Sequence, residues 1–226
     1  MAPVPAMSPA PGHGLTGIGD AGAFLARLTR LEPAALVRLR SLSDGARTTL
    51  AARLPWGVLV TRTVAGAGPG DVTVAAAQLL AVLAAGGAEL PARRDEQWRW
   101  PLPPAAAQAV ESIPVEQVRR LAAAAAGTLR TAEREGVAGR AVGQRALREA
   151  LLDHVALVVT GADGPERVEV SQRLVQAVVR MGFTGPVEAT GVAQVRIAGR
   201  WTGLCAPFGA AWWQSVNNLT IRPMGS

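Results

Sequence analysis

The residue types that most often carry enzyme chemistry are nearly absent from this sequence. Its 226 residues include no lysine, no tyrosine, one cysteine (Cys205) and two histidines. No lysine is therefore available for a nucleotide-binding loop, a kinase ion pair or a Schiff base with pyridoxal phosphate. His13 lies in a Pro/Gly-rich tail, so the remaining histidine and cysteine cannot supply the four ligands of a zinc site. We therefore expect no enzymatic activity, no cofactor and no metal.

Two local groups of residues have the types needed for catalysis or metal binding, but each has a simpler structural interpretation. His154 is the remaining candidate for a Ser-His-Asp triad, yet it lies beside Leu151 and Val155 in a predicted helix, which indicates a helix-face or core-edge residue. Glu149 and Asp153 are four residues apart on that helix and could share Mg²⁺. The flanking arginines favour ion pairs along the helix instead.

Two glycine-rich segments have the composition of phosphate-binding loops. Residues 17–22 match G-x-G-x-x-G, but a Pro/Gly tail precedes them where the dinucleotide-binding fold requires a strand. Residues 66–70 lie between a predicted strand and a predicted helix, whose N-terminus could hold a phosphate. Asp71 at the expected helix cap would occupy the same amides and repel an anion. Both segments are therefore interpreted as ordinary loops.

The overall charge suggests nucleic acid, although its distribution weakens the suggestion. All 23 basic residues are arginine, and the formal net charge is +6. The basic residues are spread over both halves of the chain, and the arginine, alanine and glycine content is typical of a GC-rich coding sequence. A solvated surface of mixed charge explains the charge as such.

The predicted elements favour a DNA-binding protein as the main hypothesis. Residues 114–214 are predicted to form three helices followed by a β-hairpin, the general order of a winged helix. The third helix, 171–181, would enter the major groove of duplex DNA, and the hairpin tip would be the wing. We thus expect a non-enzymatic regulatory protein of a high-GC bacterium. Its expected DNA-contacting residues are Gln172, Arg173, Gln176, Arg180, Arg196 and Arg200.

The tryptophans support an alternative, a protein-interaction or adaptor module that binds a protein partner or associates with itself as a dimer. Tryptophan and arginine are enriched among residues that dominate binding energy at interfaces. Neighbours in a strand face opposite ways, so one tryptophan of the pair 212–213 must be covered by another element, a second chain or a partner. The segment 98–100 is one such cover. The expected partner-binding residues are Trp98, Trp100, Trp212 and Trp213.

Local spacing also predicts the elements that position these residues. Helices are expected from Asp20 to about 31, at 71–85, at 114–135, around 142–155 and at 171–181. Strands are expected at 36–40, 47–54, 58–64, 194–197, 200–206 and 210–214. The order helix, strand, Gly turn, Arg, strand, Pro-aromatic-Gly, strand occurs twice, and either a duplication or chance would produce it.

These elements predict an α+β fold of helix-plus-β-hairpin units, duplicated in a pseudo-twofold manner if the repeat is real, with a central helical segment and a winged-helix-like C-terminal part. The expected organisation is a disordered tail at 1–19, an N-terminal α+β domain at 20–90, a Pro/Trp linker at 91–113, a C-terminal α+β domain at 114–216 and a tail at 217–226. The linker is expected to pack against another element, because its tryptophans would otherwise lie in water. A single cysteine, the lack of a signal peptide and the shortness of the apolar segment 72–85 predict a cytoplasmic protein without a membrane span.

Overall fold

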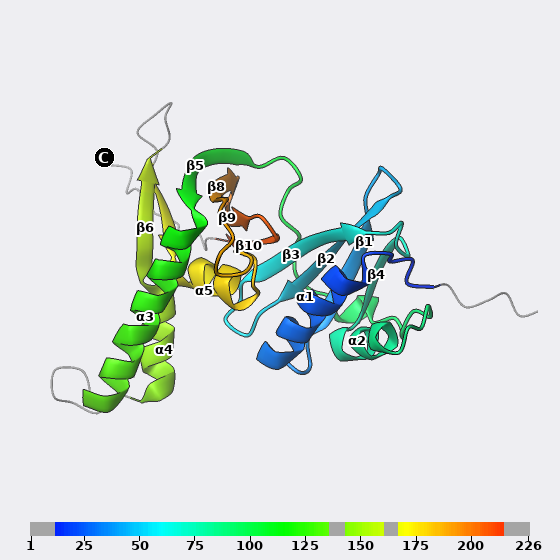
Figure 1. Cartoon of the computed structure of the whole chain (residues 1–226), viewed down its shortest axis with the longest axis horizontal. Coiled ribbons are helices and arrows are strands. Elements are labelled where there is room, and N and C mark those ends of the chain that lie inside the picture. The colour runs from blue at the N-terminus through cyan, green and yellow to red at the C-terminus, as the bar shows by residue number, and fades with distance from the viewer. Residues whose placement is uncertain (1–11, 136–142, 161–166, 215–226) are drawn as a thin grey trace, which may run out of the picture. The chain divides into compact units, whose positions relative to one another are not determined.

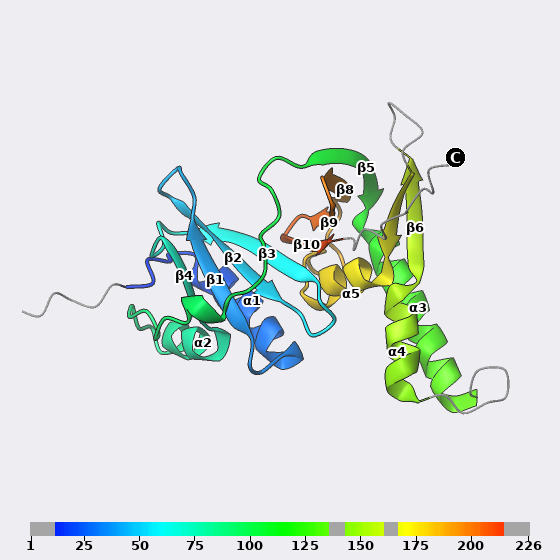
Figure 2. The same ribbon diagram turned by 180° about the vertical axis from the view of Figure 1, so that it is seen from behind.

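The computed structural model describes residues 12–135, 143–160 and 167–214. The chain divides into two compact units, Met1–Leu102 and Pro103–Ser226. The boundary falls inside the segment 91–113 that the sequence analysis treats as a linker. Each unit has its own strands, helices and buried core (Figures 1 and 2).

Unit 1 is an antiparallel sheet with helices packed on it. Its elements are α1 (Ile18–Leu31), β1 (Leu36–Ser41), β2 (Arg47–Arg53), β3 (Leu59–Ala65), β4 (Asp71–Ala75), α2 (Ala76–Ala84) and the 3₁₀ turn η1 (Asp95–Gln97). The strands pair in the order β4-β1-β2-β3. Val37 and Leu39 of β1 are fully buried and Arg40 of the same strand is exposed, as the alternating pattern predicts. On α1, Phe24, Leu25 and Leu28 are fully buried, and the helix packs against α2 (Figure 1).

Two N-terminal predictions are wrong. Residues 71–75 form strand β4, which pairs with β1, so the helix begins only at Ala76 and Asp71 caps nothing. The Asp71 carboxylate instead accepts two hydrogen bonds from the Arg38 guanidinium across the strand pair, at 2.6 and 2.8 Å. Residues 12–17, which were expected to belong to a disordered tail, are ordered and hydrogen-bonded to the rest of unit 1. His13 is buried there, with its Nε2 3.0 Å from the carbonyl oxygen of Gly87 and its Nδ1 accepting a hydrogen bond from the Leu15 amide.

Unit 2 contains a second antiparallel sheet, a separate hairpin and three helices. Its elements are β5 (Gln108–Pro114), α3 (Val115–Glu135), α4 (Gln144–Asp153), β6 (Val155–Thr160), β7 (Arg167–Ser171), α5 (Gln172–Arg180), β8 (Val192–Ala198), β9 (Trp201–Ala206) and β10 (Gly209–Gln214). The sheet order is β10-β9-β8-β5, and β6 pairs with β7 alone. Helices α3 and α4 lie side by side (Figures 1 and 2), and α5 contacts them as well as β9 and β10.

The winged-helix-like assignment of the C-terminal part is wrong. The expected order of three helices followed by a hairpin is not present: the hairpin β6–β7 separates α4 from α5, and β5 precedes α3 and pairs with β8. Both units instead have a helix followed by a three-stranded meander, α1 with β1–β3 and α5 with β8–β10. In each, a fourth strand pairs with the first strand of the meander. The result is a sheet-rich fold.

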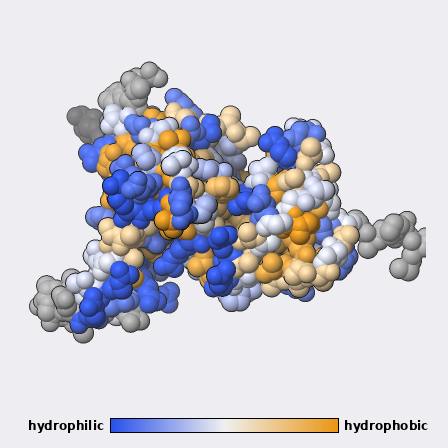
Figure 3. Space-filling view, in the orientation of Figure 1, coloured by the Kyte–Doolittle hydropathy of each residue, from blue (hydrophilic) through white to orange (hydrophobic). Residues whose placement is uncertain are grey.

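The surface differs between elements. In the view of Figure 3, hydrophilic residues cover much of the exposed side of α3 and α4, and apolar residues show on the face of unit 1 that carries α1 and α2. None of the helices in the described ranges is both long and apolar enough to cross a bilayer.

Candidate functional site

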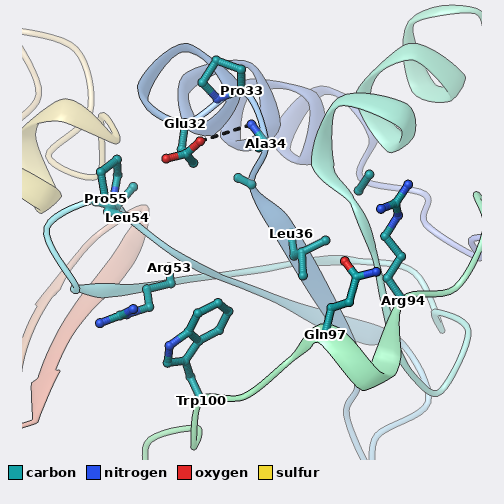
Figure 4. Close-up of a pocket in the computed structure, with 12 residues that line it drawn as sticks. Glu32, Pro33, Ala34, Leu36, Arg53, Leu54, Pro55, Arg94, Gln97 and Trp100 are labelled. Carbon is teal, nitrogen blue, oxygen red and sulfur yellow. Dashed lines mark hydrogen bonds between the residues drawn. The ribbon is translucent and has the colours of Figure 1, made fainter.

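Unit 1 contains a cavity of about 710 Å³ at one end of the sheet. That volume lies in the usual range for ligand sites. Four stretches of chain form it: the connection from α1 to β1, the end of β2 with the turn after it, Ala75 at the end of β4, and the segment 94–100 (Figure 4). We call it the Trp100 pocket. Its lining residues are Glu32, Pro33, Ala34, Ala35, Leu36, Arg53, Leu54, Pro55, Ala75, Arg94, Gln97 and Trp100.

The segment 94–100 is held against β4 by backbone and side-chain hydrogen bonds. The Arg94 amide donates to the carbonyl oxygen of Thr73 at 2.8 Å, and the Thr73 amide donates to Asp95 Oδ1 at 2.6 Å. The second Asp95 oxygen accepts a hydrogen bond from Arg93 Nε at 2.6 Å. These contacts lower the pKa of the Asp95 carboxyl, chiefly through the hydrogen bond from the Thr73 backbone. An irregular segment thereby acquires a fixed position beside the sheet.

Two tryptophans fix the wall of the pocket. Trp98 is buried, and its Nε1 donates to the backbone oxygen of Trp100 at 2.6 Å. The two rings meet edge to face, with centroids 5.4 Å apart. The Arg53 guanidinium lies 5.1 Å from the centroid of the Trp100 ring, so a cation and an aromatic face are presented together. Trp98 supports the wall through its hydrogen bond and ring contact with Trp100, and Trp100 faces the cavity (Figure 4).

Arg94 lines the same pocket in an unusual state. Its Nε atom is shielded from solvent and has no hydrogen-bond partner among the described residues. Two carboxylates of unit 1 are bound to other arginines: Asp95 to Arg93, and Asp71 to Arg38, whose hydrogen bond lowers the pKa of the Asp71 carboxyl. The pocket itself contains two guanidinium groups and one carboxylate, that of Glu32, which accepts a hydrogen bond from the Ala34 amide at 3.2 Å.

The residues expected to enter the major groove are mostly buried between helices. Gln172 and Gln176 are 4% and 9% exposed. Their side-chain amides donate to the backbone oxygens of Leu121 and Ala122 in α3, at 3.4 and 3.2 Å. They therefore join α5 to α3, and the recognition-helix assignment falls together with the winged-helix fold.

Arg173 is a structural residue of the same helix. Its Nε donates to Asp153 at 2.6 Å, a second nitrogen lies 3.8 Å from Glu149, and the guanidinium lies 5.2 Å from the centroid of the Trp213 ring. Glu149 and Asp153 thus bind an arginine of a neighbouring helix. Within the described residues, no group of three or more histidine, cysteine, aspartate or glutamate side chains is arranged to hold a metal ion.

The other arginines that were expected to contact DNA lie at the end of α5 or outside that helix. Arg180 is exposed at the end of α5, and Arg200 is exposed in the turn between β8 and β9. Arg196 donates twice to the backbone oxygen of Ala107, at 2.8 and 3.2 Å. It fastens the chain before β5 to the sheet.

The remaining candidates of the sequence analysis also have defined places. Trp212 is 8% exposed and lies across Gly203 of the neighbouring strand, where the glycine leaves room for the ring. Trp213 is half-buried and lies against the Arg173 guanidinium of its own unit. His154 lines a smaller cavity of about 450 Å³ between α3, α4 and α5.

Sequence reasoning included Trp100 but missed Arg53 and Arg94. Arg53 was assigned only to a strand, and Arg94 to the linker. The available indication was the run of two arginines immediately before a tryptophan-rich segment that was expected to pack against something. Nothing local indicates that these groups meet, because residues about 40 positions apart form the pocket.

Comparison with solved structures identifies the fold. A DNA polymerase sliding clamp from Pseudomonas aeruginosa matches at 10% identity and a TM-score of 0.50, over 88% of this chain and 63% of that chain. The beta subunit from DNA polymerase of Streptococcus pyogenes matches at 10% identity and a TM-score of 0.54, over 88% and 62%. A DNA polymerase III subunit beta from Pseudomonas aeruginosa matches at 12% identity and a TM-score of 0.52. The chain therefore spans less than two thirds of the length of these proteins. The clamp-like fold overturns the expectation of a winged-helix transcription regulator.

Comparison of the sequence with known families and proteins gives the assignment. No curated protein matches the chain. Two families match. DUF8010, a domain of unknown function, matches residues 16–100. DUF8185, also described as a domain of unknown function, matches residues 102–218, which is just over half of the sequence. The chain belongs to the DUF8185 family.

Proposed function

We propose that this protein is a non-catalytic protein-interaction module built on a clamp-like fold, and that a partner protein docks at the Trp100 pocket. The observation that carries the proposal is the pairing of Arg53 with Trp100 on the wall of that pocket. Arginine and tryptophan are the residue types that most often dominate binding energy at protein interfaces.

The fold supports the same role. The similar structures are named as a sliding clamp and as beta subunits of DNA polymerase, so they are known as components of protein assemblies. The scarcity of catalytic residue types in the sequence agrees with a non-catalytic module. Partner binding in place of transcription regulation was the alternative expectation from the tryptophans.

A photo-crosslinking experiment tests the proposal with the full chain. Benzoylphenylalanine is introduced at Gln97, which lines the pocket, or at the neighbouring Glu96, which is exposed outside it. We expect a defined partner to crosslink from position 97 and not from position 96. The same crosslink should be lost in Trp100→Ala, which keeps the Trp98 hydrogen bond because that bond ends on a backbone oxygen.

Controls separate pocket binding from surface charge. Arg53→Ala should reduce the crosslink at least tenfold, and Arg99→Ala should not, because Arg99 is exposed and does not line the pocket. The purified partner must then bind the wild-type chain directly. Equal crosslinking from both positions, or crosslinking unaffected by Trp100→Ala, would show that the pocket is not the docking site.

A further inference from the structure

We infer that the Arg94 end of the Trp100 pocket is a subsite for a carboxylate group of the docked partner. This inference rests on the proposed function, because it names the chemistry that the pocket would recognise. A carboxylate can come from an acidic side chain or a chain end, and the shared chemistry is a planar anion with one negative charge.

The state of Arg94 points to a missing ligand. A guanidinium donor that is shielded from water and has no partner is unfavourable. Among the described residues the Arg94 Nε atom is in that state, while Asp71 and Asp95 are bound to Arg38 and Arg93. Burying this unpaired donor does not stabilise the fold. An anion that binds in the cavity would give the Arg94 side chain a partner.

The same unit contains a precedent for the geometry. Arg38 binds Asp71 side-on, with Nε and one terminal nitrogen each donating to a different carboxylate oxygen, at 2.6 and 2.8 Å. Two-point pairs of this kind are among the strong hydrogen bonds that arginine makes with a carboxylate, and the side-on form requires an unoccupied Nε–H. Among the described residues, the Arg94 Nε–H donor has no partner, and the half-buried side chain lines the cavity.

The other residues that line the pocket indicate what the rest of the ligand should be. Arg94 and Arg53 lie on different sides of the cavity, with Leu36 between them and Trp100 beside Arg53 (Figure 4). A ligand with its carboxylate on Arg94 would therefore extend an apolar or aromatic body toward Leu36 and Trp100. Glu32 contributes a negative charge to the same pocket, which disfavours a doubly charged phosphate.

Benzoate is the probe that tests the subsite, since it carries one carboxylate on an aromatic ring. It is titrated into the ¹⁵N-labelled full chain at constant ionic strength, and the Nε–Hε signals of the arginines are followed by NMR. Arg94→Gln assigns the Arg94 signal. We expect saturable movement of that signal with no movement of the Arg99 signal. Benzyl alcohol, which lacks the charge, should bind at least tenfold more weakly.

Variants then check the charge argument. Arg94→Gln should weaken benzoate at least tenfold, Arg99→Gln should leave it unchanged, and Glu32→Gln should tighten it a few-fold. Should Arg94→Gln fail to fold, Arg94→Lys keeps the charge without the Nε–H donor and should still lose severalfold. Unchanged benzoate affinity in the folded Arg94 variant overturns the inference. So does equal movement of the Arg94 and Arg99 signals, or tighter binding of phenyl phosphate than of benzoate.

The two proposals fail separately. Benzoate binding that depends on Arg94, together with no crosslinked partner at Gln97, would reject the docking function and keep the carboxylate subsite. A partner that crosslinks in a Trp100-dependent way, together with benzoate affinity that Arg94→Gln does not change, would keep the docking function and reject the carboxylate subsite.

Discussion

Replacing Arg173 with alanine should destabilise unit 2. The side chain is 10% exposed and joins α5 to Asp153 and to the Trp213 ring, with Glu149 farther away. A charge-assisted hydrogen bond contributes about 1.5–3 kcal/mol, and stacking of a cation on an indole adds about 0.5–1 kcal/mol. Asp153 and Glu149 are 64% and 57% exposed, so water receives their charges when the arginine is removed. The free energy of unfolding should therefore fall by roughly 2 kcal/mol, below the sum.

Urea unfolding, with hydrogen exchange in α5 to follow unit 2 separately, measures this loss. Arg200→Ala is the matched control, because Arg200 is an exposed arginine of the same unit. The hydrogen bond from Arg173 lowers the pKa of Asp153. The contribution of the pair should thus be full at neutral pH, begin to fall as the pH drops below the unfolded pKa of about 4, and be lost as the pH falls through the lowered pKa of Asp153 in the folded chain. A loss for Arg173→Ala no larger than for Arg200→Ala, or one that is undiminished at pH 2.5, would refute this reasoning.

Three further outcomes follow from the structure. The Arg119 guanidinium donates to backbone oxygens of the loop 184–189, two of them at 2.6 and 2.8 Å. Arg119→Ala should therefore lower the free energy of unfolding by about 2–3 kcal/mol and expose that loop to hydrogen exchange. Arg120→Ala, the control, should change the stability little. Arg94→Leu should leave the urea midpoint unchanged or raise it, because it removes an unpartnered buried donor, and a clear drop would contradict that view. Burial raises the pKa of the Cys205 thiol to about 11, so iodoacetamide should modify the native chain at pH 8 about 100-fold more slowly than the urea-unfolded chain.

Local patterns allowed several elements to be predicted, and one strand shows where they failed. The helix with Phe24, Leu25 and Leu28 and the strands β1 to β3 lie where periodicity placed them. Strand β4 was assigned to a helix because alanines follow it directly. Val72, Thr73 and Val74 are β-branched and could have indicated the strand, but what holds them extended is pairing with β1, more than 30 residues earlier.

The functional interpretation failed at α5 for a related reason. Its polar residues have the types and spacing of a helix surface that meets DNA. In the folded chain Gln172, Arg173 and Gln176 are buried, because α3 supplies acceptors for the two amides and α4 supplies carboxylates for the arginine. A sequence pattern distinguishes polar from apolar faces, but it cannot show that a second helix has the partners to satisfy a polar face.

The sequence by itself determined the approximate positions of the helices and of strands β1–β3 and β8–β10, though not of β4–β7, and it indicated that the tryptophan-rich segment 91–104 packs against another element. These properties depend on residues a few positions apart. Only the tertiary structure decided the strand order, the burial of α5, and the meeting of Arg53, Arg94 and Trp100 around one cavity. Those properties depend on pairing and packing between segments far apart in the chain, which local spacing does not encode.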